Sequence, residues 1–424
     1  MTPNQSTPMR TPWGLVALMV IVMTISFIDR GNLSVAAPAM VAEMKLSAWS
    51  TGLLLSAFFW TYALFQIVSG WLSDRFEVRW VYAVGFLVWT AATFSTGLVS
   101  TFVLFLVFRL FLGIGESVTY PATSRVLAAV VPENRRGLAN SLVDLGARLG
   151  PAAGIFLGAT LLTTGQGWRS IFFLTGSLGV LWLIPWALVA PKRLASSPGA
   201  SGPKGQGLSW SQLLRSRSVW GTCGGLCGAN YSWYFLLTWL PTYLVKERQI
   251  SFGSLAFLGT LPFLLMVVSS LGCGILADRL ISKGGSAVRV RKGFLVIGLS
   301  LTAIFMLGVL SPRGELAITS LMIACFTFGI YASNLFALTQ ALAGAGAAGR
   351  WTGLQNACGN LAGIVSPMFT GWMVERTGTF AMPFVCAGIA CLAGAASFGL
   401  LVGNKPLAGP AFAAQVGERE GEPA

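Results

Sequence analysis

Charged residues are scarce in this chain, and histidine is absent. Asp, Glu, Lys and Arg together make up 10% of the 424 residues, whereas soluble globular domains contain about 25%. A soluble globular fold is therefore excluded. Without histidine, no proton relay can run through imidazole rings. The sequence also lacks the G-x-x-x-x-G-K-S/T loop that holds phosphates, which argues against direct use of ATP by this chain.

Cysteine is used sparingly as well, with 7 in the chain. All of them lie within apolar stretches, and no pair has the spacing of a metal site. We therefore expect small buried residues there, and neither a metal nor a cofactor. The first apolar run is too long for a cleavable signal peptide and carries Asp29 and Arg30, so we expect it to remain as the first helix.

Twelve apolar stretches fill the chain, each long enough to cross a bilayer, for which about 20 residues suffice. The predicted spans are 13–39, 49–72, 79–98, 101–127, 138–162, 169–190, 217–243, 252–276, 293–311, 315–340, 351–373 and 380–402. The sequence thus predicts an all-α membrane protein whose twelve transmembrane helices are surrounded by the lipid bilayer.

Lys and Arg outnumber Asp and Glu, 28 to 14, which invites a nucleic-acid interpretation. When the spans are laid out with the N-terminus inside the cell, most basic residues fall in cytoplasmic loops. Such an excess is the positive-inside rule and reports topology. We therefore predict no nucleic-acid partner, and a multi-pass protein of the cell inner (plasma) membrane with both termini cytoplasmic.

Two patterns recur in corresponding places of the two halves. Gly70–Arg75 recurs as Gly274–Arg279, 204 positions later. A second set recurs 216 positions later and pairs Gly137, Leu138, Asn140, Leu145 and Pro151 with Gly353, Leu354, Asn356, Leu361 and Pro367. The repeats predict two pseudo-symmetric six-helix bundles, 1–190 and 217–424. A cytoplasmic linker rich in Pro, Gly and Ser joins them at 191–216, and a disordered tail begins at residue 403.

Two repeats of six helices joined by a cytoplasmic loop are typical of a rocking secondary transporter, in which the substrate site lies between the two halves. The sequence resembles the major facilitator superfamily over residues 13–402, and we expect a monomer. The family's loop motif reads G-x-L-x-D-R-x-x-x-R, and the second copy keeps its first part. The motif residues are Gly70, Leu72, Asp74, Arg75 and Arg79, repeated as Gly274, Leu276, Asp278 and Arg279.

This loop motif predicts a conformational latch. We expect Asp74 to lie at the positive end of a neighbouring helix and to pair with basic residues, which would hold the outward-open state. The alternative is a solvated turn that merely obeys the positive-inside rule. The predicted latch residues are Gly70, Asp74, Arg75, Arg79, Asp278 and Arg279.

Three acids and three bases interrupt the apolar spans, all in the first half: Asp29, Glu116, Asp144, Arg30, Arg109 and Arg148. An ionised side chain in hydrocarbon costs at least about 2.5–3.5 kcal/mol, so such residues usually mark an ion or substrate path. Adjacent helix positions diverge by about 100°, so Asp29 and Arg30 cannot both reach one point. Arg109 and Glu116 lie two turns apart and share a helix face.

Structural interpretations of these polar residues remain open. Asp29, Arg30, Arg109 and Glu116 could form an interhelical network that only fixes packing, although apolar side chains would do this at lower cost. Asp144 and Arg148 are spaced i,i+4 and can neutralise each other. Polar side chains of the second half could bind a hydroxylated ligand or join helices. These are Ser333, Asn334, Gln355, Asn356 and Asn360.

A longer pattern is more specific. Residues 27–36 read FIDRGNLSVA, and they are accompanied by WTY at 60–62, R-x6-E at 109–116 and NLAGI at 360–364. The pattern is similar to the anion:cation symporter family, and within it to bacterial symporters of galactonate, glucarate and hexuronates. The chain departs from the galactonate type at Ala147, where a glutamine is expected, and at Phe336, where a tryptophan is expected. The identity of the sugar acid therefore stays open.

The resemblance implies roles for five residues. Asp29 and Glu116 would carry protons, Arg30 and Tyr62 would contact the substrate, and Arg109 would tune the glutamate. An arginine favours the ionised carboxylate and an apolar surrounding favours the neutral acid, so Glu116 would be poised between the two states.

We therefore expect a transporter, not an enzyme, that moves a small organic anion, a sugar acid of the hexonate or hexuronate type, together with protons by alternating access. The expected substrate-binding residues are Arg30, Tyr62, Arg109, Arg148, Ser333, Asn334, Gln355, Asn356 and Asn360. The main alternative is a proton-coupled antiporter that exports drugs or metabolites. A transporter-like sensor and a channel are further alternatives.

Overall fold

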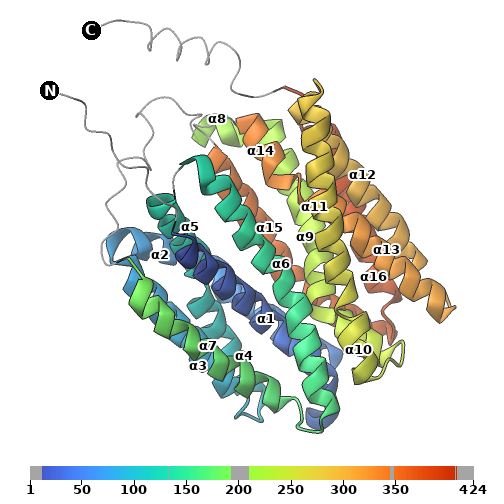
Figure 1. The fold of residues 1–424 in the computed structure, drawn as a ribbon. Helices are drawn as coiled ribbons and strands as arrows, with labels where there is room; N and C mark the ends of the chain where they lie inside the picture. The colour runs from blue at the N-terminus through green and yellow to red at the C-terminus, as the bar shows by residue number, and fades with distance from the viewer. Residues whose placement is uncertain (1–11, 132, 192–209, 344–347, 406, 408–424) are drawn as a thin grey trace, which may run out of the picture. The chain divides into compact units, whose positions relative to one another are not determined.

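The computed structural model describes residues 12–131, 133–191, 210–343, 348–405 and 407, and these form helices with no strand among them (Figure 1). Most of the predicted linker and nearly all of the predicted tail lie outside these residues. Contacts divide the chain into two compact units. One comprises the described residues of Met1–Pro198 with Leu237–Phe263, and the other those of Gly199–Leu236 with Leu264–Ala424.

The first unit is built on seven helices from the N-terminal part of the chain. They are α1 (Trp13–Met44), α2 (Ala48–Arg75), α3 (Val78–Thr96), α4 (Phe102–Glu116), α5 (Thr119–Val130), α6 (Glu133–Thr163) and α7 (Arg169–Val189). The end of α9 (Arg217–Lys246) and α10 (Phe252–Leu258) complete it. Within it, α1 packs on α6 while α3 lies beside both α4 and α7 (Figure 1).

The second unit contains α8 (Trp210–Arg215), the first part of α9 and the helices that follow α10. The helices after α10 are α11 (Leu261–Ser282), α12 (Ala287–Gly308), α13 (Gly314–Ala332), α14 (Leu335–Ala343), α15 (Ala348–Thr377), α16 (Ala381–Ala396) and the π-helix η1 (Ser397–Leu401). Here α12 runs between α13 and α16 (Figure 1). The division differs from the predicted bundles because 237–263 groups with the first unit, where the Thr260 hydroxyl donates to the Ala152 carbonyl at 3.2 Å.

Each of the twelve predicted spans coincides with a helix or with two consecutive helices. Among the described residues, nine helical segments are long and apolar enough to cross a membrane. The three remaining positions are filled by α3, α9 and α15, which are 19, 30 and 30 residues long. These three helices contain polar and charged residues, such as Arg79 in α3, but each is long enough to cross a bilayer.

The internal repeat extends to details of the backbone. Lys45 after α1 and Gln249 after α9 both adopt positive φ, at 52° and 55°. Ser47 and Ser251 then cap the next helices, accepting hydrogen bonds from the backbone N–H of Ser50 and Ser254. Both pairs are separated by the 204 positions of the repeated loop motif. The two halves therefore share a local turn, as expected of a duplicated unit.

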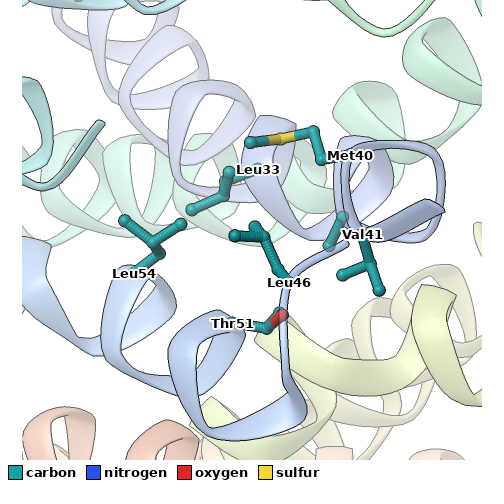
Figure 2. Close-up of a pocket in the computed structure, with 7 residues that line it drawn as sticks. Leu33, Met40, Val41, Leu46, Thr51 and Leu54 are labelled. Atoms are coloured by element: carbon teal, nitrogen blue, oxygen red, sulfur yellow. The ribbon is translucent and has the colours of Figure 1, made fainter. Parts of the chain in front are cut away.

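A small hollow lies where α1 turns into α2 (Figure 2). Apart from the Thr51 hydroxyl, its lining is apolar and consists of Leu33, Ala37, Met40, Val41, Leu46 and Leu54. No charged side chain reaches it, so it offers nothing to recognise an anion. The buried charges of α1, Asp29 and Arg30, precede these residues in the sequence.

Candidate functional site

The candidate site in the first unit is a cluster of four buried charges on α1 and α4. Asp29, Arg30 and Arg109 are 3%, 5% and 3% exposed, and Glu116 is fully buried. Their burial is costly without partners. The sequence predicted that these four residues belong together, and the structure brings them together.

Arg30 and Glu116 form a buried ion pair between α1 and α4. The Nε of Arg30 lies 2.8 Å from Oε2 of Glu116, and the Ser26 hydroxyl donates to the same oxygen at 2.8 Å. The other carboxylate oxygen, Oε1, is buried and has no hydrogen-bond partner among the residues that the structure describes. Spacing along α4 pointed to Arg109 as the partner of Glu116, whereas the hydrogen-bonded partner in the structure is Arg30.

Aromatic rings surround the Arg30 guanidinium. Its carbon lies 4.4 Å from the ring centre of Phe27, 4.9 Å from that of Phe58 and 4.5 Å from that of Tyr62. The rings of Phe58 and Tyr62 are stacked at 4.9 Å. Cation–π contacts of this kind hold a guanidinium in place without neutralising its charge. Arg30 and Tyr62, both predicted substrate contacts, are thus neighbours.

Arg109 lies at the edge of this cluster. Its guanidinium carbon is 5.9 Å from the Phe58 ring centre, and its Nε is buried without a hydrogen-bond partner. It acts electrostatically on both Glu116 and Asp29. A donor in this position can receive a ligand carboxylate.

Asp29 points away from Arg30, as the rotation of about 100° per residue requires. Its Oδ2 accepts from the indole Nε1 of Trp89 on α3 at 2.6 Å, and its Oδ1 accepts from Nδ2 of Asn32 at 2.8 Å. Asn32 Nδ2 also donates to the Thr175 hydroxyl of α7 at 2.8 Å. Sequence analysis assigned no role to Trp89, Asn32 or Thr175, although Asn32 lies in the FIDRGNLSVA pattern.

Two glycines of α4 hold the cluster close to its neighbours. An added Cβ at Gly113 would meet the carbonyl of Phe58 and the hydroxyl of Thr61 on α2. At Gly115 it would lie 2.5 Å from the backbone nitrogen of Trp89 on α3. Small residues allow such close helix contacts. The glycines therefore set the distance from α4 to the helices that carry Tyr62 and Trp89.

Asp144 and Arg148 lie on α6 and form the predicted i,i+4 pair, with Nη2 and Oδ2 3.0 Å apart. Their side chains are 55% and 25% exposed. They do not belong to the buried cluster. Arg148 as a substrate contact stays a prediction, as do the substrate contacts of the second unit.

The polar residues predicted in the second unit fall in three places. Gln355 is buried, accepts from the Thr339 hydroxyl at 2.6 Å and thereby joins α14 to α15. Asn360 accepts from the Tyr234 hydroxyl of α9 at 2.8 Å. Asn356 lies one residue beyond Gln355 and is half-buried. Gln355 is thus placed as a link between helices.

Ser333 and Asn334 lie at the break between α13 and α14, close to the second copy of the loop motif. Asn334 donates to the Ser333 hydroxyl at 3.1 Å, and its Oδ1 accepts from Arg291 of α12 at 3.3 Å. Arg291 also pairs with Asp278 of α11 at 2.8 Å. Sequence reasoning missed Arg291, because its partners are distant in the sequence.

The first copy of the loop motif is described only in part. The side chain of Asp74 lies outside the described residues. Arg75 and Arg279 are exposed, and an added Cβ at Gly70 would meet nothing within 4 Å. The Arg79 guanidinium lies over the Trp80 ring at 4.6 Å, and the Arg79 carbonyl accepts from the Trp186 indole at 3.0 Å. The latch therefore stays a prediction.

Comparison with known proteins identifies the family. The model of the Major Facilitator Superfamily matches residues 19–367. The chain is 30% identical over 432 residues to the D-galactonate transporter of Escherichia coli O6:H1, covering 95% of this chain and 98% of that one. It is 31% identical over 392 residues to the probable sulfoacetate transporter SauU of Cupriavidus necator, covering 88% and 90%. The chain therefore belongs to the Major Facilitator Superfamily.

The fold is also shared with a solved structure. A bacterial homolog of the human lysosomal transporter Spinster, in its inward-facing and unoccupied conformation, matches with a TM-score of 0.73 at 18% identity. The match covers 94% of this chain and 95% of that one. This match confirms the predicted fold class, and the family model and the relatives confirm the predicted family. The protein is a multi-pass membrane transporter with organic-anion transporters among its relatives, and not an enzyme.

Proposed function

We propose that this protein carries a small organic anion into the cell together with protons. The substrate is a sugar acid of the hexonate or hexuronate type, which is moved by alternating access across the inner (plasma) membrane. The observation that carries the proposal is the buried Arg30–Glu116 pair beside Arg109, because each of Glu116 and Arg109 retains an unpartnered polar atom. A network that only fixed packing would satisfy those atoms.

The charges of the cluster explain why binding of the anion and binding of the proton depend on each other. With Asp29 and Glu116 ionised, two acids balance two arginines. An anion alone would add an uncompensated negative charge to a buried site, which is costly. A proton on Glu116 restores the balance and weakens its hold on Arg30, which becomes available to a ligand carboxylate. Anion and proton therefore bind more favourably together than either does alone.

The proposed size and chemistry of the anion are inferred from the relatives. The names of two relatives specify galactonate and sulfoacetate, both small organic anions. The hydroxyl groups of a sugar acid need hydrogen-bonding partners, for which Asn356 and Asn360 remain the candidates. The Tyr62 hydroxyl, which interacts with Arg30 and Gln66, is a further candidate.

Transport by purified protein in liposomes tests the proposal. We expect an inward proton gradient to drive accumulation of galactonate or glucarate, with protons entering in step as reported by a pH-sensitive dye. Glu116→Gln and Asp29→Asn should abolish accumulation, while exchange of labelled for unlabelled substrate survives in at least one of them. Accumulation that persists in both variants, or after the proton gradient is collapsed, would refute proton coupling.

The direction of transport separates symport from the antiporter alternative. If an inward proton gradient expels substrate from preloaded liposomes, the protein is an exporter. A thermal-shift screen against sugar acids, aromatic carboxylates and sulfonates then identifies the passenger, because stabilisation grows as RT ln(1 + [L]/Kd) and reveals even weak ligands in excess.

A further inference from the structure

Asp29 belongs to a hydrogen-bond network that joins three helices, separate from the Arg30–Glu116 pair. Trp89 of α3 donates to Oδ2, Asn32 of α1 donates to Oδ1, and Thr175 of α7 accepts from Asn32. Trp89 and Thr175 are 0% and 5% exposed, and Asn32 is 1% exposed. The charged groups that act on Asp29 are Glu116 and Arg109, both on α4.

The two oxygens of Asp29 differ in how well their surroundings suit a bound proton. An indole N–H donates and never accepts, so a proton on the oxygen that faces Trp89 would have no acceptor there and would weaken the hydrogen bond from the indole. A carboxamide presents either a donor or an acceptor, depending on how it is turned. A proton on Asp29 therefore belongs on Oδ1, the oxygen that faces Asn32.

The side-chain oxygen of Asn32 can accept a hydrogen bond from the protonated Asp29. This oxygen, Oδ1, is buried and has no hydrogen-bond partner in the structure. If the amide turns over, this oxygen accepts from the protonated Asp29 and from Thr175, whose hydroxyl now donates to the Ile171 carbonyl at 2.9 Å. A hydroxyl can make either kind of hydrogen bond, so Thr175 follows the change.

We propose that Trp89 and Asn32 are positioning residues that set where and when Asp29 takes up a proton. Trp89 holds one oxygen as an acceptor, which favours the carboxylate. Asn32 reverses its hydrogen bond, which gives the neutral acid a partner of its own. The inference rests on the proposed function in that Asp29 is a proton carrier. The change in hydrogen bonding around Asp29 does not itself require substrate.

Infrared difference spectroscopy of the full-length protein in lipid tests this without transport. Acidification should produce a neutral-carboxyl band that is missing in Asp29→Asn. In Trp89→Phe the titration midpoint of this band should move to higher pH, by about one unit or more, because the indole N–H stabilises the charged carboxylate more than the neutral acid. In Asn32→Leu the band should move to higher wavenumber, because the acid has lost its acceptor.

Matched variants exclude a general loss of packing. Trp182 belongs to the same aromatic stack, but its indole donates to the Leu18 carbonyl at 3.0 Å, so Trp182→Phe should leave the Asp29 band and its midpoint unchanged. Thr175→Val offers a second, conservative variant, with the band altered in the same direction as in Asn32→Leu.

The possible results are distinct. An Asp29 band that is insensitive to Trp89→Phe, or to both Asn32→Leu and Thr175→Val, overturns the inference and leaves proton-coupled transport standing. If acidification produces no band that depends on Asp29, then both the inference and the role of Asp29 as a proton carrier are wrong. The role of Glu116 is decided separately by the transport assay.

Discussion

Arg30 of α1 and Glu116 of α4 form an ion pair of 2.8 Å in the interior of the first unit. Three aromatic rings enclose the arginine, and one carboxylate oxygen has no hydrogen-bond partner. The pair thus combines a positive charge that is held in place with an acid that is only partly satisfied. An anion and a proton are the two species that such a pair can take up.

The pair should be strongly coupled in stability. Replacing either partner alone leaves a buried charge without compensation, so Arg30→Met and Glu116→Leu should each cost about 3–5 kcal/mol. The double variant should recover much of this loss, because two apolar side chains replace the pair. Unfolding of the purified protein in detergent, monitored for all four forms, measures the coupling.

The exposed pair of α6 provides the comparison. The double variant Arg148→Met, Asp144→Leu removes an exposed ion pair with i,i+4 spacing. Exposed pairs with this spacing contribute coupling energies of about 0.3–0.5 kcal/mol. Additive losses at Arg30 and Glu116, similar to those at Asp144 and Arg148, would show that the buried pair is not coupled as the geometry indicates.

Tyr62 should act through both its ring and its hydroxyl. Tyr62→Phe keeps the stacking against Phe58 and Arg30, so the protein should remain stable while substrate affinity falls a few-fold. Tyr62→Leu also removes the cation–π contact, worth about 0.5–2 kcal/mol, and should weaken binding further. Thermal shifts at graded substrate concentrations separate affinity from stability. Equal affinity in wild type and Tyr62→Leu would remove Tyr62 from the site.

The loop motif should govern rate and leave affinity intact. Asp278→Asn weakens the pair with Arg291, which joins α11 to α12, and Asp74→Asn changes the matching position of the first half. If these residues latch one conformation, both variants slow substrate exchange while the substrate Kd changes little. Kd and exchange rate are measured on the same liposome preparations. A large change in Kd with normal exchange would contradict a latch.

The order and the approximate positions of the helices could be predicted from the sequence because apolar length and the internal repeat are local properties. The duplicated turns at Lys45 and Gln249 show how far the repeat extends. The breaks that follow Glu116 and Ala332 also lie 216 positions apart, the spacing of the second repeated pattern. Neither break could be recognised beforehand, since the apolar composition continues through both.

The partners within the site were harder to predict. Spacing places Arg109 and Glu116 on one face of α4, but it does not fix how α1 is rotated against α4, which decides that Arg30 is the partner of Glu116. Trp89 was missed for a similar reason, because an indole in an apolar helix resembles a core residue until its N–H is seen to face Asp29. Which side chains of different helices become partners depends on how the helices pack, and sequence periodicity alone does not determine that packing.

The glycines between Arg109 and Glu116 offer a test of that packing. At Gly113 the main-chain carbonyl of Phe58 and the Thr61 hydroxyl occupy the space of an added methyl group, and the Thr61 hydroxyl also donates to the Leu110 carbonyl at 2.8 Å. Backbone atoms cannot move aside as a flexible side chain can. Gly113→Ala should therefore push α2 away from α4 and destabilise the protein by about 1–3 kcal/mol.

The same displacement should reach the site, because α2 carries Phe58 and Tyr62, which lie against Arg30. We expect Gly113→Ala to lower both the melting temperature and substrate affinity. Gly272→Ala in α11 is the matched control, since an added Cβ there meets nothing within 4 Å. It should be neutral or slightly stabilising, as alanine is in a helix. Wild-type stability and affinity in Gly113→Ala would show that the contact between α2 and α4 is looser than the structure indicates.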